Sequence, residues 1–515
     1  MCAITGVYSS DGKAALYARN ILHFLQNRGQ DTAGVYTLRE NGKVDYRKGE
    51  GKVLEVFGRL LLPDGTSLGN VHKITQFAGN NAVGHTRYQT TERGGPYNAQ
   101  PFSTKNQRYT VIMSHNGHVN NFADVAESLN LEDRIREDKF VDQHPEVKID
   151  CDVTAIMYVF ADGLQKSNDP VEGIMQGAEN VMKHIRGAYT VSAAVHDNKT
   201  GKTYQVAFKD PRGIRPGFFG QQNGSFAIAS ETYALERTHF WNIKPIKNAE
   251  VVIFDGKETI RRQIEPFSKM EYLPCQFEPG YFSRALSCLD GRSINHGRFM
   301  EGLALARKIM HEKPEWADII DFVTYIPHTP MPISKGLAKG LDKDFRVTIE
   351  KDLYDYKREF IALAETRHKK TKDQSYVHWD AVCGRNFILT DDSIVRGDTM
   401  KENIAMLRFA GAVNIYVASG YPRIEYPCDL GVDMKTHEEL IAHGRTDEQI
   451  AKDIGADGLI FLSQPEYAHS WDTVDIDAGI RRKIELGIFS PEILEFVSNG
   501  KRCNACVTGK NPTHD

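Results

Sequence analysis

The stretch FILTDDSIVRGDT, residues 387–399, places two adjacent carboxylates at the end of an apolar strand and before a glycine-containing turn. A helical pattern follows over residues 400–410, and residues 413–418 again have the composition of a buried strand. A strand, a loop, a helix and a second strand within about thirty residues form a βαβ unit, whose two strands are parallel. The stretch therefore predicts an α/β domain with a parallel sheet.

The loop of this unit has the composition of a site for a phosphorylated sugar. Its backbone N–H groups and the hydroxyls of Ser393 and Thr399 can hold a phosphate at the helix N-terminus. The carboxylates of Asp391 and Asp392 can accept hydrogen bonds from two ribose hydroxyls or support a hydrated Mg²⁺ shared with a pyrophosphate. Acidic residues before a helix are also common N-caps, but that role does not account for two acids followed by Ser-x-x-Arg-Gly-x-Thr.

Upstream of this unit the chain has a different pattern. With 515 residues it is long enough for two or three domains. Short strands and intervening helices predict an α+β domain of stacked antiparallel sheets with flanking helices. A polar segment near residues 266–274 separates the two patterns, and we place the domains at residues 2–268 and 269–515. The strands of the first domain are expected at residues 83–87, 110–113 and 189–195, and its helices at residues 153–164 and 174–185.

Composition and charge exclude several classes of function. The formal net charge is −4, which gives no reason to expect nucleic acid or an acidic membrane surface as a partner. No apolar run approaches the roughly 18 residues that a membrane span needs, and the N-terminus lacks the features of a signal peptide. We therefore expect a cytoplasmic protein.

Cys2 follows the initiator Met1, so removal of Met1 makes it the first residue of the chain. A free α-amino group has a pKa of about 7.7–8.0 and can exchange a proton with the adjacent thiol near neutral pH. One residue then supplies both nucleophile and base, as in N-terminal threonine hydrolases. Taken alone, the position is equally well explained as one that tolerates a small residue.

Three short polar segments accompany Cys2: NRGQDTAG at residues 27–34, GHTRY at residues 84–88 and HNG at residues 115–117. An amino-acid amide under attack needs a cation for its α-carboxylate, an anion for its α-ammonium group and donors for the oxyanion. The planar guanidinium of Arg87 suits a carboxylate, and Asn116 with the N–H of Gly117 offers two oxyanion donors. An Asn-Gly pair is more often a plain hairpin turn, and a lone arginine is usually solvated.

Together with Met-Cys-x-Ile-x-Gly at the N-terminus, these segments resemble the class II glutamine amidotransferases in order and spacing, over about the first 240 residues. The resemblance implies an N-terminal-nucleophile (Ntn) hydrolase sandwich. The sequence departs from the family at Ala3 and at residues 151–154, where Cys-Asp-Val-Thr replaces the usual Ser-Asp-Ser-Glu. The implied catalytic residues are Cys2, Asn116 and Gly117, and the implied glutamine-binding residues are Arg28, Arg87, Thr90 and Asp152.

The loop at residues 390–399 resembles that of type I phosphoribosyltransferases, in the form found in the amidophosphoribosyltransferase family. That family carries a class II glutaminase domain in front of such a domain, the order seen here over nearly the whole chain. The resemblance implies transfer of ammonia from glutamine to 5-phosphoribosyl diphosphate, the first step of purine synthesis, in a homotetramer inhibited by purine nucleotides. The implied phosphoribosyl-diphosphate site contains Asp391, Asp392, Ser393, Val395, Arg396, Gly397 and Thr399, and the implied Mg²⁺ site contains Thr329, Asp391 and Asp392.

Two loops depart from the family. Residues 326–330 read Ile-Pro-His-Thr-Pro where Pro-Asp-Ser or Pro-Glu-Thr-Ser is usual, and the loop that closes over the sugar matches only at scattered positions of residues 351–361. Closure excludes water and completes a site, so these changes bear on the acceptor. An amidotransferase with a different acceptor and a non-catalytic regulator that binds phosphoribosyl diphosphate are the alternatives.

The chain has eight cysteines, few for a disulfide framework, and in a reducing compartment clustered cysteines more often bind metal or catalyse. Only Cys503 and Cys506 are closely spaced, while Cys275 and Cys428 stand where the cluster-bearing amidophosphoribosyltransferases place their ligands. The resemblance implies a [4Fe–4S] cluster on these four thiolates, and a structural zinc is the alternative. The remaining three are predicted to be buried small hydrophobes: Cys151, Cys288 and Cys383.

Overall fold

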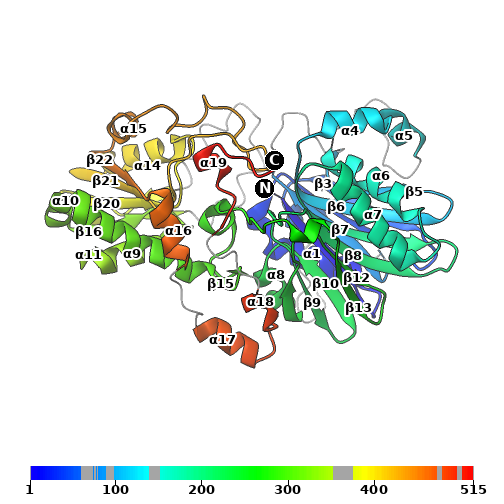
Figure 1. The fold of residues 1–515 in the computed structure, drawn as a ribbon. Helices are drawn as coiled ribbons and strands as arrows, with labels where there is room; N and C mark the ends of the chain where they lie inside the picture. Colours follow the sequence, from blue (N-terminus) through cyan, green and yellow to red (C-terminus); the bar gives the residue numbers. More distant parts are fainter. Residues whose placement is uncertain are drawn as a thin grey trace.

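The computed structural model describes residues 2–58, 74, 77, 79–88, 98–138, 151–351, 375–472, 478–495 and 501–513. Two antiparallel sheets form the first half of the chain, and a parallel sheet lies in the second half, at the opposite side of the molecule in Figure 1. Both ends of the chain lie between the halves in that view. The predicted order of an α+β Ntn sandwich followed by an α/β domain is confirmed.

The first half consists of four layers. Strands of one sheet pack against β6, β7 and β8 of the other, α1 (Ala14–Phe24) covers the outer face of the first sheet, and α6 (Asp152–Leu164) and α7 (Pro170–His184) cover that of the second. Every residue of β7 is buried because the strand lies between a sheet and helices. The seven-stranded sheet has the order β11 (Trp241–Pro245), β9 (Phe218–Gln222), β10 (Ser225–Ala229), β1 (Ala3–Tyr8), β4 (Asn81–Arg87), β2 (Thr32–Leu38) and β3 (Val44–Glu50). The six-stranded sheet has the order β13 (Thr259–Gln263), β12 (Glu250–Phe254), β8 (Thr203–Lys209), β7 (Gly187–Asp197), β6 (Tyr109–Val119) and β5 (Phe102–Lys105).

The second half is built on a parallel sheet with helices on its faces. Two of these helices approach closely because each has a glycine at the contact: a Cβ on Gly302 would lie 1.9 Å from the carbonyl oxygen of Ile333, and one on Gly336 would lie 2.0 Å from that of Phe299. The five strands have the order β17 (Asp344–Phe345), β16 (Phe322–Tyr325), β20 (Asn386–Asp391), β21 (Asn414–Ser419) and β22 (Gly458–Phe461). The helices are α9 (Ile294–Glu312), α10 (Pro314–Ile319), α11 (Met331–Leu341), α14 (Asp398–Phe409), α15 (Asp447–Ile454) and α16 (Gln464–Asp472).

Short elements connect these layers. In the first half they are η1 (Gln26–Arg28), α2 (Val53–Phe57), α4 (Phe122–Ser128), α5 (Leu131–Glu137), α8 (Thr232–Arg237) and η3 (Phe267–Lys269). In the second half they are η4 (Glu278–Phe282), β14 (Cys288–Leu289), β15 (Arg292–Ser293), β18 (Ile349–Lys351), β19 (Ser375–Val377), α13 (Trp379–Val382), α17 (Ala478–Glu485), α18 (Glu492–Glu495) and α19 (Ala505–Thr508).

The end of the chain returns to the first half. The backbones of Ile243 in β11 and Phe489 pair in an isolated parallel β-bridge. The side-chain amide of Asn120 donates to the hydroxyl of Thr513 at 3.1 Å. The last strand of the antiparallel sheets ends at Gln263 and α9 begins at Ile294, so the predicted boundary falls in the segment between them. The division into residues 2–268 and 269–515 stays a prediction, because residues near the C-terminus contact both halves.

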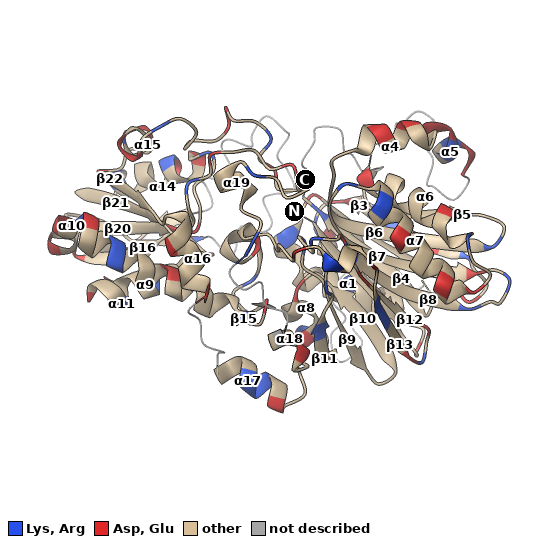
Figure 2. Cartoon of the chain, in the orientation of Figure 1, with Lys and Arg blue, Asp and Glu red and all other residues tan. Residues whose placement is uncertain are grey.

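The surface carries charges of both signs. Figure 2 shows lysine, arginine, aspartate and glutamate spread over helices and loops of both halves, while the strands are mostly uncharged. Among the described residues, no helix has the length and the apolar character that crossing a membrane requires.

Candidate active sites

Cys2 lies directly before β1, a central strand of the seven-stranded sheet. Strand pairing places its neighbour Ala3 opposite Thr86 of β4, and the N–H of Ile4 donates to the hydroxyl of Ser230 at 3.0 Å. The backbone nitrogen of Cys2, which becomes the α-amino group when Met1 is removed, lies 3.4 Å from Oδ1 of Asn116. The nucleophile predicted from the sequence is therefore half-buried and held by contacts from three other segments.

Asn116 and Gly117 are on β6, next to Cys2. Asn116 is fully buried, and its side-chain amide nitrogen has no hydrogen-bond partner among the described residues. Such a buried donor costs free energy unless an acceptor arrives, so it suits a developing oxyanion. Gly117 has φ +155°, and a Cβ there would lie 1.8 Å from the carbonyl oxygen of Ala188, so only glycine fits. The structure brings both predicted donors together, and their role stays a prediction.

Arg87 and Asp152 lie close to this group. Arg87 ends β4 and donates to the carbonyl of Asn98 at 3.2 Å. Asp152 is the first residue of α6, and its Oδ2 accepts from the N–H of Val119 at 2.9 Å and contacts Nδ1 of His118 at 3.0 Å. Burial raises the pKa of Asp152, but hydrogen bonding and charge from His118 outweigh it and the net pKa is lowered. Thr90 lies outside the described residues.

Arg28 has a different environment from the one the sequence suggested. Its guanidinium is fully buried and donates to the carbonyl oxygen of Cys2 at 3.2 Å, to Glu231 at 3.0 Å and to both oxygens of Glu278 at 2.8 Å. Arg215, also buried, lies 3.5 Å from the same Glu278. Burial opposes the charge of Arg28, but the two glutamates outweigh it and raise its pKa. Arg28 thus holds the backbone of Cys2, and its predicted contact with glutamine stays a prediction.

The other three members of this buried quartet are residues to which the sequence assigned no role: Arg215, Glu231 and Glu278. The quartet joins the halves of the molecule, because Glu231 also accepts from the N–H of Arg284 at 3.0 Å and the hydroxyl of Ser287 at 2.6 Å. Two positive and two negative charges balance without solvent. The sequence gives only a weak indication that these four residues form ion pairs, because each is the only member of the quartet in its own part of the chain.

The acidic pair lies at the end of β20, as predicted. The loop then runs to Gly397, which has φ +84° and caps the N-terminus of α14. The N–H of Asp392 donates to the carboxylate of Asp391 at 2.9 Å, and the hydroxyl of Ser393 donates to that of Asp392 at 3.1 Å. Burial, followed by mutual repulsion, raises the pKa of Asp391, and burial raises that of Asp392. Bound hydroxyls or a cation would relieve both effects.

Other side chains surround the acidic pair. The side chain of Thr329 lies near Asp392 and acts to lower its pKa, so the predicted Mg²⁺ ligands are neighbours. Arg298, for which the sequence predicted no role, is a buried cation whose charge acts against the rise in the pKa of Asp392. It donates to the backbone carbonyls of Pro279 at 3.0 Å and Ser283 at 2.9 Å. Arg396 has its guanidinium bonded to Glu439, with Nε at 2.8 Å from Oε2. Of the remaining predicted residues, Val395 accepts through its carbonyl from Ile441 at 2.9 Å, and Thr399 accepts from Asn403 at 2.7 Å.

The segment η4 lies between the two candidate sites. Glu278 of this segment binds Arg28, and the carbonyl of Pro279 accepts from Arg298, whose charge acts on Asp392. Burial is the main cause that raises the pKa of Tyr281, and the charges of Asp392, Tyr88 and Asp391 add to the rise. The glutaminase-like residues and the residues around the acidic pair therefore both contact this one short element.

Four cysteines converge at the junction of the halves, from three separate parts of the chain. The backbones of Cys275 and Cys503 pair in an isolated parallel β-bridge, and the N–H of Glu425, three residues before Cys428, donates to the carbonyl of Cys506 at 3.0 Å. Burial raises the pKa of Cys275 to about 11, and it also raises the pKa values of Cys503 and Cys506, with the neighbouring thiols adding to the shift. No three His, Cys, Asp or Glu side chains among the described residues are placed to hold a single metal ion.

The three other cysteines were predicted to be buried. Cys151 and Cys288 are buried, but Cys383, at the end of α13, is exposed and the prediction for it is wrong. A short helix at the edge of the domain leaves this side chain uncovered. All eight cysteines are free thiols in the structure.

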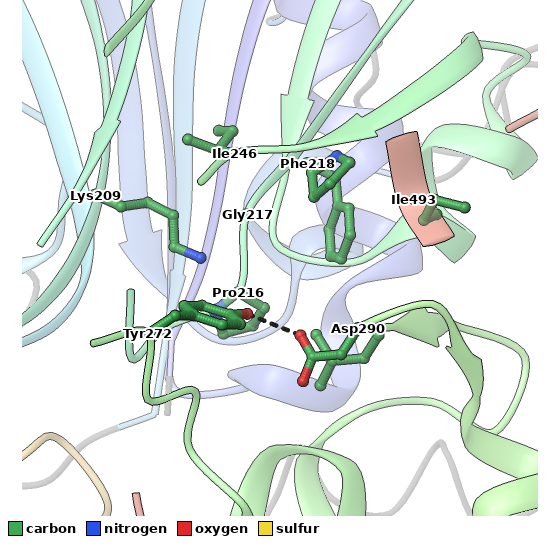
Figure 3. A pocket seen from close by; sticks show the side chains of 10 residues that line it. Lys209, Pro216, Gly217, Phe218, Ile246, Tyr272, Asp290 and Ile493 are labelled. Carbon is green, nitrogen blue, oxygen red and sulfur yellow. Dashed lines mark hydrogen bonds between the residues drawn. The ribbon is translucent and has the colours of Figure 1, made fainter. Parts of the chain in front are cut away.

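A small pocket is lined by none of the residues predicted for the two candidate sites. Lys209, Tyr272 and Asp290 line it, with a hydrogen bond of 2.8 Å from the Tyr272 hydroxyl to Asp290 (Figure 3). Its volume is about 10 Å³, room for roughly one water molecule.

Comparisons with known proteins agree with this arrangement. Residues 85–237 match the family described as "Glutamine amidotransferase domain". The chain is 33% identical to the amidophosphoribosyltransferase of Pasteurella multocida, with 90% of this chain and 87% of that protein covered. It is 34% identical to that of Pseudomonas aeruginosa, with 94% and 90% covered.

Two solved structures resemble the whole fold. One is the glutamine phosphoribosylpyrophosphate amidotransferase of B. subtilis in complex with ADP and GMP, with a TM-score of 0.75, 26% identity and coverage of 99% of this chain and 97% of that one. The other, described as the allosteric regulatory enzyme of purine biosynthesis, has a TM-score of 0.77, 26% identity and coverage of 99% and 96%. With both halves, their order and the identity to curated relatives in agreement, the chain belongs to the amidophosphoribosyltransferase family.

Proposed function

We propose that this chain transfers ammonia from glutamine to 5-phosphoribosyl diphosphate, giving 5-phosphoribosylamine, pyrophosphate and glutamate at the start of purine synthesis. The observation that carries the proposal is the pairing of two sites across η4: Cys2 with Asn116 on one side and the Asp391–Asp392 pair on the other. Membership of the amidophosphoribosyltransferase family supports it.

The first half-reaction takes place at Cys2. Its sulfur attacks the side-chain carbonyl carbon of glutamine, and the α-amino group accepts the thiol proton. The oxyanion is bound by the free amide nitrogen of Asn116 and the N–H of Gly117. Collapse of this intermediate breaks the C–N bond and releases ammonia, and water then hydrolyses the γ-glutamyl thioester to glutamate. Arg87 binds the α-carboxylate of glutamine and Asp152 binds its α-ammonium group.

The second half-reaction takes place at the acidic pair. Asp391 and Asp392 bind the ribose hydroxyls, and the loop to Thr399 holds the 5′-phosphate at the start of α14. Ammonia that has passed η4 attacks C1 of the sugar, and pyrophosphate leaves with the electrons of the C–O bond. Thr329, Asp391 and Asp392 would hold Mg²⁺, which neutralises the charge of the leaving pyrophosphate. The buried carboxylates with raised pKa fit such a cation.

The decisive experiment measures glutamate and pyrophosphate together. Protein purified without oxygen is incubated with glutamine, with and without 5-phosphoribosyl diphosphate and Mg²⁺. We expect one pyrophosphate for each glutamate, and none when glutamine and ammonia are both omitted. Glutamate without pyrophosphate would mean that the acceptor is a different molecule. Binding of 5-phosphoribosyl diphosphate without release of glutamate or pyrophosphate would favour a regulator.

We also propose that purine nucleotides inhibit the reaction and that the protein is a homotetramer. The first proposal is supported by the solved relative in complex with ADP and GMP. In the same assay, GMP should lower the rate, and light scattering should give four times the chain mass of 58.0 kDa.

For the four cysteines we propose a [4Fe–4S] cluster rather than zinc. Zinc–sulfur bonds are about 2.3 Å long, so a single zinc ion brings four thiolates close to one another. A [4Fe–4S] cluster is held by four thiolates around a group of four iron atoms, so the thiolates lie farther apart. The thiols of Cys275, Cys428, Cys503 and Cys506 come from three parts of the chain and influence one another's pKa values, which supports one group shared by all four. When bound, the cluster would tie the C-terminal segment to the rest of the molecule.

Metal analysis separates the two. Protein purified without oxygen should contain about four iron and four sulfide per chain and absorb broadly in the visible range. Cys506→Ser should lower both the iron content and this absorbance. Stoichiometric zinc without iron would contradict the proposal.

A further inference from the structure

His118 directly follows the candidate oxyanion residues but was not identified from the sequence. It lies near the end of β6, one residue beyond Gly117, and its side chain is about half exposed (48%). Its Nδ1 lies 3.0 Å from Oδ2 of Asp152, the carboxylate assigned to the α-ammonium group of glutamine. The two residues are 34 positions apart, and only the start of α6 beside the end of β6 brings them together.

Both described donors to Asp152 use the same oxygen. The N–H of Val119 and Nδ1 of His118 contact Oδ2, and no described hydrogen bond uses Oδ1. The side chain of Asp152 is 19% exposed, so a substrate can reach the carboxylate. His118 and the ammonium group of glutamine would therefore bind opposite oxygens of one anion.

We propose that His118 is a positioning residue that makes glutamine binding depend on pH, because it shares the carboxylate of Asp152 with the ammonium group of the substrate. The inference rests on the proposed function of this site. A neutral His118 still donates a hydrogen bond from Nδ1 and keeps the carboxylate of Asp152 in place. The full negative charge of this carboxylate then attracts the α-ammonium group of glutamine. A protonated His118 adds a second cation beside the substrate's own and weakens its binding.

The groups around His118 favour its protonated form in the empty site. The hydrogen bond with Asp152 is the main cause that raises the pKa of His118, partial burial opposes it, and the charges of Asp152 and Asp429 add to the rise. Lys435 acts in the opposite direction. On the side of Asp152, the other titrating neighbour is His115, whose pKa burial lowers to about 4, so it stays neutral at physiological pH.

The sign of the effect follows from these groups. Below its raised pKa, His118 carries a charge and glutamine must bind against it. Above that pKa, His118 is neutral and binding is strongest. Glutamine binding therefore releases part of a proton near neutral pH, and affinity should fall as pH falls. Two unit charges about 4 Å apart repel in water by an amount equal to about a fivefold change in affinity.

Calorimetry on the full-length Cys2→Ala variant, which binds glutamine without turning it over, tests this directly. We expect the Kd of L-glutamine to be about fivefold higher at pH 6.5 than at pH 8.5. Titrations in buffers of different ionisation enthalpy should show proton release at pH 7. Glutaramate, which is glutamine without its amino group, should bind with a Kd that does not rise at pH 6.5.

Two substitutions in the same background separate charge from structure. His118→Asn retains a hydrogen-bond donor without a charge and should bind glutamine with a Kd that is flat with pH. His118→Lys carries a permanent charge and should bind weakly at both pH values. Equal Kd values at both pH values for the parent, or an unchanged pH dependence in His118→Asn, would overturn the inference. Absence of glutamine binding at every pH would instead overturn the proposed glutaminase function, and the inference with it.

Discussion

Cys2→Ala should abolish pyrophosphate release with glutamine as the donor while leaving it intact with ammonia. The variant lacks the sulfur that forms the thioester, so glutamine-dependent activity should fall by at least ~10³-fold, the order that loss of a covalent nucleophile costs. Ammonia needs no thioester and enters the second half-reaction directly. The measurement is the initial rate of pyrophosphate release with each donor, after intact-mass determination shows that Met1 has been removed.

Cys383→Ala is the matched control for this experiment. It makes the same substitution at an exposed thiol on the end of α13, before the start of β20, whereas the acidic pair lies at the other end of that strand. It should retain both activities. If Cys2→Ala retained the glutamine-dependent rate, the nucleophile would have to be another residue, and the assignment of the Ntn half would fail.

Glu278→Gln should destabilise the protein strongly. The carboxylate of Glu278 binds both Arg28 and Arg215, and all three side chains are fully buried. A neutral amide at this position leaves two buried guanidinium groups with only Glu231 to balance them. Removal of one partner from a buried ion pair typically costs about 3–5 kcal/mol of unfolding free energy. The measurement is the urea concentration at the midpoint of unfolding, which should be clearly lower for the variant than for the unchanged chain.

A surface glutamate provides the control for this second experiment. Glu132 is paired with Arg136 one helical turn away, and both side chains are mostly exposed. Glu132→Gln should change the unfolding free energy by less than about 1 kcal/mol. A shift for Glu278→Gln as small as that of Glu132→Gln would show that the buried quartet does not hold the halves together.

Local patterns in the sequence predicted most of the elements. The helix expected at residues 153–164 is α6 (Asp152–Leu164), and the strand expected at residues 413–418 is β21 (Asn414–Ser419). These two predictions are correct because hydrophobic periodicity and apolar content are properties of a few neighbouring residues. The strand expected at residues 110–113 is longer, β6 (Tyr109–Val119), because pairing with β7 continues through the polar His115, Asn116 and Gly117. Burial between two layers overrides the composition there.

The sequence by itself determined the order of the two folds, the position of Cys2 and the loop with Asp391 and Asp392, because each depends on a contiguous run of residues. Tertiary structure alone decided that Arg28 bonds with Glu278 and that His118 reaches Asp152. The physical reason is that ion pairs and thiol clusters form between whichever groups share a desolvated space. Which groups share it depends on how distant layers pack, and no local pattern encodes that.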